Sequence, residues 1–290
     1  MIQPVGFLVI YINNYMINSI DSIGIYGVGF VGRAIFNTFK KKGVNVTGYD
    51  KFVTGYDNQH DMLQCGIIFL CLPTKFDSKT NSYDKSCIRE ACKFLVDNEY
   101  KGPVIIKSTV EPESTSTLEV KFELNLIHNP EFLTARTADH DYLNQTHIVL
   151  GRGDNCSNEN YQKVLDFHQT HFPEAEVSQC SSIESESMKI FANCLYSVKV
   201  QFFTELYLLC EKSGINYELV KNMIVKNGWV NPMHTDVPGP DGQISYGGLC
   251  FPKDTNALLS VMKNNDIPCE VLESVINERN LMRNDNENCI

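Results

Sequence analysis

The sequence predicts an α/β fold in which a doubly wound parallel sheet is followed by an all-helical domain with one long central helix. Short apolar runs alternate with helical stretches as far as about residue 180, which is typical of a parallel sheet covered by helices on both faces. Glycines spaced as G-x-G-x-x-G directly follow the first apolar run. Residues 182–212 contain neither Gly nor Pro, and this predicts a single long helix.

The first part of the chain contains short apolar runs that predict strands, separated by stretches with apolar residues at helical spacing. The strands are expected at residues 23–26, 44–49, 66–72, 104–106, 124–128 and 147–150. Helices are expected between them at residues 31–39 and 88–96.

The second part predicts helices without strands. An apolar stripe follows the long helix and contains Ile183, Ile190, Phe191, Cys194, Leu195, Val198, Phe202, Leu206 and Leu209. Further helices are expected at residues 218–225, 255–263 and 270–282, with a loop rich in Pro and Gly at 232–248. The chain therefore divides into an N-terminal extension at residues 1–20, an α/β domain at 21–179 and a helical domain at 180–290.

Composition excludes several classes of protein. Apolar residues make up 43% of the 290 residues and charged residues 21%, which is the range of soluble globular proteins. The formal charge of −10 argues against a nucleic-acid partner, and the apolar run at residues 6–12 is too short to span a membrane. Eleven cysteines without a C-x-x-C pair argue against a structural metal site and favour a reducing, cytoplasmic location.

The glycine motif lies between an expected strand and an expected helix, which is the context of a Rossmann-type dinucleotide-binding domain. It consists of Gly27, Val28, Gly29, Phe30, Val31 and Gly32. The free N–H groups at the start of the helix favour a pyrophosphate. Asp50, at the end of the next strand, is expected to accept hydrogen bonds from a ribose, which favours NAD. Lys51 leaves NADP as an alternative, and a glycine turn without a ligand is the alternative to a cofactor site.

Small hydroxyl residues follow two further predicted strands. Pro73 and Thr74 follow one strand, and Ser108 and Thr109 follow another. Open α/β sheets bind ligands at the carboxyl ends of their strands, so these residues are expected to contact the cofactor. Each pair is also common in ordinary helix caps and turns.

Three polar residues are candidates for catalysis. Glu131 follows the strand at 124–128 and is expected at the cofactor edge of the sheet, where a carboxylate can act as a general base. Lys189 and Asn193 lie four residues apart on the long helix and share a face. A cation and an amide there can stabilise an oxyanion. Solvated surface positions are the alternative for all three.

Cys250 is the candidate nucleophile. It lies in the segment YGGLCFPKD, which runs from residue 246 to residue 254. Gly247 and Gly248 are expected to leave space for a substrate near the sulfur, and Lys253 with a following helix start is expected to favour the thiolate. Most other cysteines lie in apolar runs, where a cysteine is usually a small buried side chain.

In this order, the motifs LPT, STV, NPEFL, the helix with Lys189 and Asn193, and YGGLCFPKDT resemble the UDP-glucose/GDP-mannose dehydrogenase family. The resemblance extends from about residue 23 to residue 283. It implies NAD-dependent oxidation of a UDP-hexose, with UDP-glucose to UDP-glucuronate as the expected reaction, in two hydride transfers. It also implies a homodimer or higher oligomer formed through the long helix.

The resemblance implies a role for each matched residue. Cys250 would form a thiohemiacetal and then a thioester, and Glu131 would be the base for hydrolysis of the thioester. Lys189 and Asn193 would stabilise the oxyanion, and Thr109 and Asp254 would organise water near the sulfur. The expected substrate contacts are Glu131, Phe132, Leu133, Thr134, Lys189, Asn193, Tyr246, Gly247, Gly248 and Cys250. Residues 21–179 would form the NAD-binding domain, and 180–290 the dimerisation and catalytic-cysteine domain.

The chain departs from the family pattern in two places. Family members continue with a second α/β domain that binds UDP, and this sequence ends at Ile290, where that domain would begin; a member without the C-terminal domain is therefore expected. The family has a second Glu four residues after the one matched by Glu131, and here this position is Ala135. Arg136, which follows, is a candidate contact for a phosphate.

Three alternative functions remain open from the sequence. One is a non-catalytic, NAD-binding dimeric relative. Another is a dehydrogenase for a different nucleotide sugar, such as a UDP-N-acetylhexosamine or GDP-mannose. The third is a short β-hydroxyacid dehydrogenase, a group that uses no nucleophilic cysteine, so the segment around Cys250 argues against it.

Overall fold

The central sheet contains seven strands in the order β2-β1-β3-β6-β7-β8-β9 within the computed structural model, which describes residues 22–134, 136–283 and 285. The strands are β1 (Ser22–Tyr26), β2 (Asn45–Tyr49), β3 (Ile67–Leu70), β6 (Pro103–Ile106), β7 (Asn125–His128), β8 (His147–Arg152) and β9 (Glu176–Ser181). The expected extension at residues 1–20 and Ala135 lie outside the described residues.

Neighbouring strands are parallel except for β7 and β8, which are antiparallel. The chain passes from β1 to β2 on one side and then to β3 on the other side of β1. The carboxyl ends of β1 and β3 therefore flank the point where the strand order reverses, which is where open α/β sheets bind ligands. The prediction of a doubly wound Rossmann-type sheet is confirmed. Strands β8 and β9 run opposite to the other five strands, a detail that the apolar pattern of the sequence does not specify.

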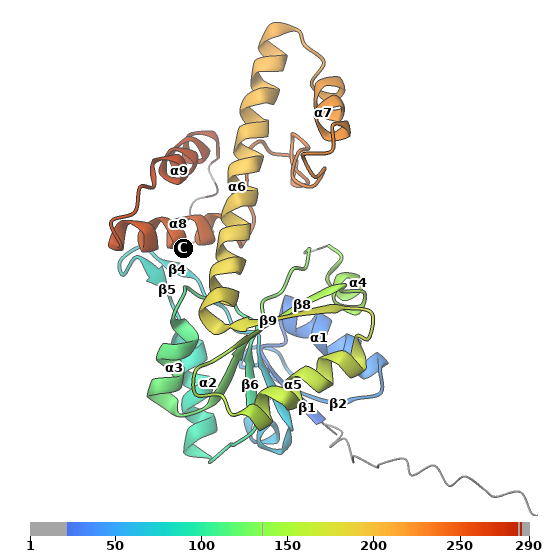
Figure 1. The fold of residues 1–290 in the computed structure, drawn as a ribbon, viewed down its shortest axis with the longest axis vertical. Helices are drawn as coiled ribbons and strands as arrows, with labels where there is room; N and C mark the ends of the chain where they lie inside the picture. The colour runs from blue at the N-terminus through green and yellow to red at the C-terminus, as the bar shows by residue number, and fades with distance from the viewer. Residues whose placement is uncertain (1–21, 135, 284, 286–290) are drawn as a thin grey trace, which may run out of the picture.

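Helices cover both faces of the sheet (Figure 1). One face carries α1 (Phe30–Lys41), α4 (Ala138–Leu143) and α5 (Asn158–His171). The other carries the 3-10 helix η1 (Gln59–Gln64), α2 (Ser86–Asp97) and α3 (Ser114–Phe122). Strand residues such as Phe69 and Ile105 are fully buried between these layers, and burial of apolar surface on both sides stabilises a parallel sheet.

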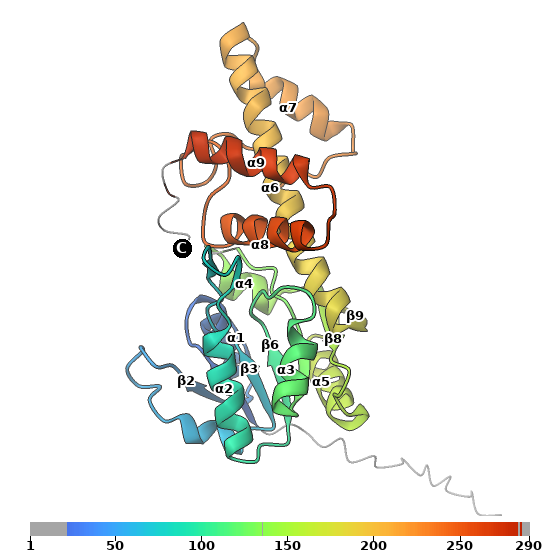
Figure 2. The ribbon, with the colours of Figure 1, turned by 90° about the vertical axis from the view of Figure 1, so that its left-hand side faces the viewer.

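The long helix α6 (Ser182–Ser213) begins directly after β9 without a loop. Ser181 and Glu184 form a capping box at its start, because each side chain accepts a hydrogen bond from the backbone N–H of the other. Gly214 ends the helix with a φ of +67°, a conformation that glycine adopts at little cost. The single long helix expected at 182–212 is therefore present, and it rises from the sheet (Figures 1 and 2).

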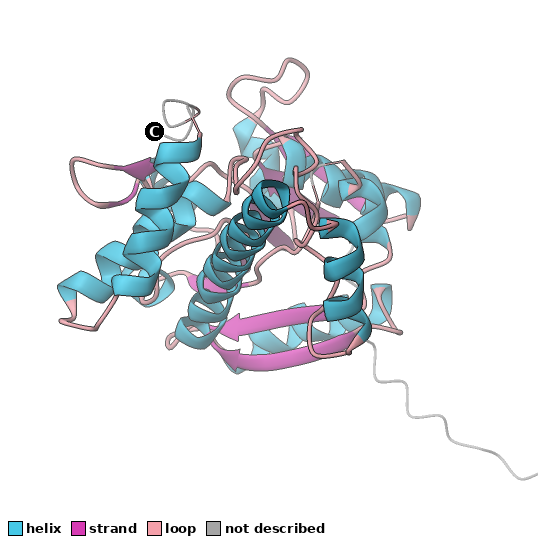
Figure 3. Ribbon diagram, turned by 90° about the horizontal axis from the view of Figure 1, so that it is seen from above, coloured by secondary structure: helices cyan, strands magenta, loops and turns pink. Residues whose placement is uncertain are grey.

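Three further helices pack around α6. They are α7 (Tyr217–Lys226), α8 (Phe251–Asn264) and α9 (Glu270–Met282). Seen from above, α8 and α9 lie on one side of α6 and α7 on the other (Figure 3). Helix α8 begins four residues earlier than expected, because Pro252 occupies its first turn, where a missing N–H costs nothing. No helix of the described chain has the length and apolar character needed to cross a membrane.

A small hairpin connects the two parts of the molecule. It consists of β4 (Phe76–Asp77) and β5 (Ser82–Tyr83), which are antiparallel. The hairpin belongs to the α/β part in sequence, yet Tyr83 is buried in a core with Ile190 of α6 and Leu258 of α8. The sequence pattern did not predict this hairpin, because each strand has only two residues.

Candidate active site

The glycine motif forms the turn between β1 and α1, and its three glycines meet different surroundings. A Cβ atom on Gly27, which has a φ of +83°, would lie 2.4 Å from the carbonyl oxygen of Cys71. A Cβ atom on Gly32 would lie 1.9 Å from the carbonyl oxygen of Gly27. Around Gly29, no described atom lies within 4 Å of such a Cβ. The outer glycines are therefore required by the fold, and Gly29 leaves space for a ligand.

Helix α1 presents its first turn toward this space, and no side chain of the described chain caps it. Its free N–H groups and the partial positive charge of its N-terminus suit a pyrophosphate. The Asp50 carboxylate accepts hydrogen bonds from the N–H groups of Val28 (2.8 Å) and Phe52 (2.9 Å). A carboxylate has lone pairs for more than these two donors, so Asp50 fits a ribose as well. The exposed Lys51 is paired with Glu90 at 3.4 Å.

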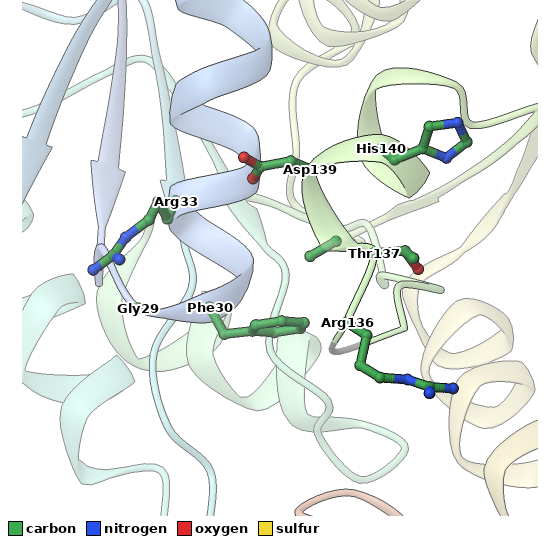
Figure 4. Close-up of a pocket in the computed structure, with 8 residues that line it drawn as sticks. Gly29, Phe30, Arg33, Arg136, Thr137, Asp139 and His140 are labelled. Carbon is green, nitrogen blue, oxygen red and sulfur yellow. The ribbon is translucent and has the colours of Figure 1, made fainter. Parts of the chain in front are cut away.

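An open cavity of about 650 Å³ adjoins the glycine turn (Figure 4). Gly29 and Phe30 line one side, and Arg136 and Thr137 line the other. Figure 4 shows the Phe30 ring between the first turn of α1 and Arg136, and Arg33 of α1 also lines the cavity. The predicted phosphate contact, Arg136, therefore adds a positive charge to the cavity in front of α1.

The hydroxyl residues at the ends of β3 and β6 hold these two strand ends together. The Ser108 hydroxyl donates to the carbonyl oxygen of Leu72 at 2.6 Å and accepts from its N–H at 3.0 Å. The Thr74 hydroxyl donates to the carbonyl oxygen of Thr109 at 2.7 Å. Thr74, Ser108 and Thr109 are buried, and Pro73 is exposed. These bonds give the hydroxyls a structural role, and their contact with the cofactor stays a prediction.

Glu131 and Lys189 form a buried pair between the sheet and α6. The Lys189 ammonium donates to the backbone carbonyl of Glu131 and lies 3.4 Å from Glu131 Oε1. Glu131 Oε2 accepts a hydrogen bond of 2.6 Å from the N–H of Leu133. The ammonium also lies 5.1 Å from the centre of the Phe132 ring. The carboxylate is therefore held in one orientation, and the alternative of a solvated surface residue does not apply.

Sequence reasoning missed Lys107, which supports the loop that carries Glu131. Its ammonium is buried and donates to Asn129 Oδ1 (2.9 Å) and to the carbonyl oxygen of Pro130 (3.2 Å). Burial lowers the pKa of Lys107 to about 8, and the nearby Cys71 and Glu131 offset this in part. The sequence feature that could have identified Lys107 is its position directly after the apolar strand at 103–106 and directly before Ser108.

Asn193 and Asp254 form a second pair, between α6 and α8. Asn193 Nδ2 donates to Asp254 Oδ2 at 2.6 Å, and Lys253 Nζ donates to Asp254 Oδ1 at 2.6 Å. The Tyr83 hydroxyl also donates to Asp254 Oδ1. Asp254 is fully buried, and its contacts are therefore with Asn193, Lys253 and Tyr83. The role predicted for it, that of organising water, stays a prediction.

Cys250 is the N-cap residue of α8 and is exposed. Surrounding protein desolvates its thiol and raises the pKa, and Lys253 and Lys189 counteract this only in part. Lys253 lowers the pKa of this thiol, the direction expected from the sequence, but desolvation outweighs its contribution. Glu131 also raises the pKa of this thiol. Cys250 thus lies within the electrostatic reach of Glu131 and Lys189.

The two glycines before Cys250 differ in their surroundings. Gly248 has a φ of +79°, and no described atom lies within 4 Å of an added Cβ. A Cβ on Gly247 would lie 2.2 Å from the Arg283 guanidinium. Gly247 therefore makes room for Arg283, which corrects the expectation that both glycines clear space beside the sulfur.

The remaining predicted substrate contacts lie around this junction. Phe132 and Thr134 are exposed, and Leu133 is half-buried. The N–H of Thr134 donates to Asp141 Oδ2 at 2.9 Å. Tyr246 is buried, which raises its pKa to about 12. The role of these residues in substrate binding stays a prediction.

The fold and these residues define a Rossmann-type dinucleotide-binding protein with a cysteine where the sheet domain meets the helical domain. A family profile for the NAD-binding domain of the UDP-glucose/GDP-mannose dehydrogenases matches residues 51–169, and a profile for their central domain matches residues 183–280. The chain belongs to the UDP-glucose/GDP-mannose dehydrogenase family. The family and the NAD cofactor expected from the sequence are confirmed.

Individual relatives agree with this assignment. The chain is 30% identical over 234 residues to the UDP-glucose 6-dehydrogenase of Rickettsia bellii, covering 78% of this chain and 51% of that protein. It is 27% identical over 219 residues to the UDP-glucose 6-dehydrogenase TuaD of Bacillus subtilis, covering 72% and 45%. The chain thus spans about half the length of the curated relatives that it matches.

Solved structures show the same fold. A UDP-glucose dehydrogenase from the archaeon Pyrobaculum islandicum superposes with a TM-score of 0.78 at 20% identity, covering 90% of this chain and 68% of that one. A 3-hydroxyisobutyrate dehydrogenase from Mycobacterium tuberculosis gives a TM-score of 0.70 at 15% identity, covering 89% and 92%. At these identities the likeness concerns the fold alone.

Proposed function

We propose that the protein is an NAD-dependent dehydrogenase that oxidises a UDP-hexose, with UDP-glucose to UDP-glucuronate as the specific reaction. One observation carries the proposal: Cys250 caps α8 one turn before the buried Asp254, whose carboxylate accepts a hydrogen bond from Asn193. The charges of Glu131 and Lys189, which form a pair at 3.4 Å, also act on the Cys250 thiol. These are the residue types needed for covalent oxidation through a sulfur. The names of the relatives support UDP-glucose as the substrate.

In this proposal, the glycine turn before α1 and Asp50 would hold NAD, which would supply the hydride acceptor for each of two oxidations. The first oxidation converts the primary alcohol of the sugar to an aldehyde. Addition of the Cys250 sulfur to the aldehyde carbon then forms a thiohemiacetal, and the proton of the thiol is transferred to the former carbonyl oxygen. The second oxidation converts the thiohemiacetal to a thioester, and water then cleaves the C–S bond to give the carboxylate and the free thiol. Two NAD are reduced and one water is consumed for each sugar.

The protein residues have separate parts in this sequence. Glu131 is the base that takes a proton from the attacking water, since its carboxylate is fixed by the Leu133 N–H and by Lys189. Lys189 and Asn193 stabilise the negative charge on the reacting oxygen. Buried Asp254 holds the Asn193 amide. Because the pKa of the free Cys250 thiol is raised, a bound substrate or a proton acceptor has to assist the release of its proton.

We also propose that two copies associate through α6. Phe191, Leu195 and Phe202 are large apolar residues on this helix and more than half exposed, and Ile183, Met188, Phe191 and Leu195 line an apolar hollow. Burial of such a face against a second copy is favourable. Residues 21–179 would then be the NAD-binding domain, and 180–290 the dimerisation and cysteine domain. A reducing cytoplasm suits the exposed thiol of Cys250.

The direct test measures NADH formation with purified protein, NAD and UDP-glucose, and compares it with the Cys250→Ala variant. Two NADH for each UDP-glucuronate are expected from the wild type, and no UDP-glucuronate from the variant. Matched reactions with GDP-mannose and a UDP-N-acetylhexosamine identify the sugar. Binding of NAD without turnover of any of these nucleotide sugars would contradict the proposal and favour the non-catalytic alternative.

A further inference from the structure

The hairpin β4–β5 brings a tyrosine of the sheet domain into the site between the helices. The backbone N–H of Tyr83 donates to Glu111 Oε1 at 2.5 Å, and Lys85 Nζ lies 2.6 Å from Glu111 Oε2. Glu111 follows the segment at the carboxyl end of β6, and it is buried. The end of the hairpin is therefore tied to the cofactor edge of the sheet, while its tyrosine ring packs against α6 and α8.

The Tyr83 hydroxyl and the Lys253 ammonium hold the same oxygen of Asp254. The hydroxyl donates to Oδ1, and Nζ of Lys253 lies 2.6 Å from Oδ1 and 4.3 Å from the centre of the tyrosine ring. The other oxygen, Oδ2, accepts from Asn193 at 2.6 Å. With Oδ1 held by two donors, the carboxylate cannot rotate without breaking charge-assisted hydrogen bonds. Oδ2 is therefore directed at the Asn193 amide.

The hydroxyl remains a donor over the whole working range of pH. Burial raises the pKa of Tyr83 well above its ordinary value of 10.0, and the charge of Asp254 raises it further. Tyr83 is itself buried, so water does not compete for the carboxylate. The hydrogen bond from Tyr83 to Asp254 is therefore maintained throughout this pH range.

We propose that Tyr83 is a positioning residue of the active site, whose hydroxyl fixes the Asp254 carboxylate and through it the Asn193 amide. This inference rests on the proposed function, in which Asn193 stabilises charge on the reacting oxygen. A small displacement of such a donor reduces the rate of the chemical step strongly. It also gives the hairpin a role, since the hairpin brings a residue of the sheet domain to α8, the helix that Cys250 caps.

The test compares two buried tyrosines that lose the same hydroxyl. Tyr100 is buried, its hydroxyl donates to the carbonyl oxygen of Cys65 at 3.0 Å, and it packs in the core under α2. Tyr83→Phe and Tyr100→Phe each remove one buried hydrogen bond, so similar decreases in Tm are expected. Only Tyr83→Phe is expected to lower kcat, by roughly ten- to a hundredfold. The KM for the sugar and the Kd for NAD should stay within about twofold of the wild-type values.

A kcat of Tyr83→Phe equal to that of the wild type would overturn the inference. Equal losses of kcat in both variants would do the same, because they would indicate loss of stability alone. As a further measurement, the double variant Tyr83→Phe with Asp254→Asn should lose no more activity than Asp254→Asn alone, since Tyr83 acts through Asp254. Additive losses would contradict this pathway.

A second readout separates failure of this inference from failure of the proposed function. The buried hydroxyl proton between Tyr83 and Asp254 should give a downfield, slowly exchanging proton resonance. This resonance should be absent in Tyr83→Phe, unchanged in Tyr100→Phe and shifted upfield in Asp254→Asn. If no nucleotide sugar is oxidised, this spectrum still tests the contact, and a wild-type spectrum without the resonance would overturn the inference.

Discussion

Single residues in the glycine turn separate the requirements of the fold from those of ligand binding. A side chain on Gly32 would collide with the backbone of Gly27, whereas Gly29 faces open space. Both positions carry the same residue type in one motif. Gly32 is therefore needed for the fold and Gly29 for ligand access, a difference that the sequence motif does not show.

Gly29→Ala and Gly32→Ala are expected to fail in different ways. Gly32→Ala forces a backbone shift and should lower the free energy of unfolding by roughly 1–3 kcal/mol, measured by denaturant titration. Gly29→Ala should keep the wild-type stability and weaken NAD binding by about tenfold or more, because the methyl group occupies the approach of the pyrophosphate. Calorimetric titration with NAD measures this affinity. Wild-type affinity in Gly29→Ala would show that the cofactor lies elsewhere.

The reactivity of Cys250 reports which charges surround its sulfur. Glu131 raises the pKa of the thiol and Lys189 lowers it. The apparent pKa for alkylation by iodoacetamide should therefore fall in Glu131→Gln and rise in Lys189→Met. Mass spectrometry of the Cys250 peptide follows the rate as a function of pH. Cys250→Ala measures the background alkylation of the other cysteines. Unchanged pKa values in both variants would show that the charges of Glu131 and Lys189 do not act on the Cys250 sulfur.

Part of the site was predictable from the sequence pattern, because Glu131 follows a strand and Lys189 and Asn193 share a helix face. Asp254 was expected only from the family resemblance. Glu131, Lys189, Asn193 and Asp254 form the two pairs described above. Lys107 and Tyr83 were not predicted, since a lysine after an apolar strand and a tyrosine in a strand of two residues have no special spacing. Only the packing of distant segments gives them partners.

At the scale of elements, α3 and α6 are joined by a buried carboxyl group. Glu186 Oε1 of α6 accepts hydrogen bonds from the N–H (2.7 Å) and the hydroxyl (2.5 Å) of Thr115 in the first turn of α3. Burial nevertheless raises the pKa of Glu186 to about 7. Desolvation of the charged form therefore outweighs the hydrogen bonds that favour it.

Glu186 should make stability depend on pH near neutrality. Its folded pKa lies above the ordinary value of 4.5, so its contribution is complete below pH 4.5 and is lost as the pH rises through about 7. The difference corresponds to roughly 3 kcal/mol. Glu186→Gln keeps an acceptor for Thr115 without a charge, and it should gain stability relative to the wild type from pH 5 to pH 8. Thermal melts of both proteins from pH 5 to pH 8 measure the difference in stability. A difference that does not vary with pH would contradict the prediction.

Helices and strands with a long apolar pattern were predicted well. Elements whose formation or direction depends on tertiary contacts were predicted poorly. The strands of the sheet core and the long α6 follow from periodicity. The direction of β8 depends on how its neighbours are connected, and the hairpin β4–β5 depends on a core made by α6 and α8. The early start of α8 follows from Pro252, which lies between the loop expected at 232–248 and the helix expected at 255–263.

At the scale of the whole molecule, the exposed face of α6 leads to the prediction of a dimer. Leu195 on α6 is 64% exposed and Val120 on α3 is 76% exposed. Leu195→Glu should convert a dimer to a monomer, because a charge in the contact is not solvated. The same change at Val120 should leave the dimer intact. Light scattering during gel filtration measures the mass, and a dimer that persists in Leu195→Glu would place the contact on another face.

The hairpin also has a consequence for the ancestry and engineering of the chain. A fragment that stops after Ser181 would leave Phe76 and Tyr83 in water, and a fragment that starts at Ser182 would lack two side chains from its interior. Each part therefore depends on the other to complete its core, and neither can be transferred to another protein alone. Recombination that swaps the portion bearing Cys250 between homologues has to carry the segment from Phe76 to Tyr83 with it.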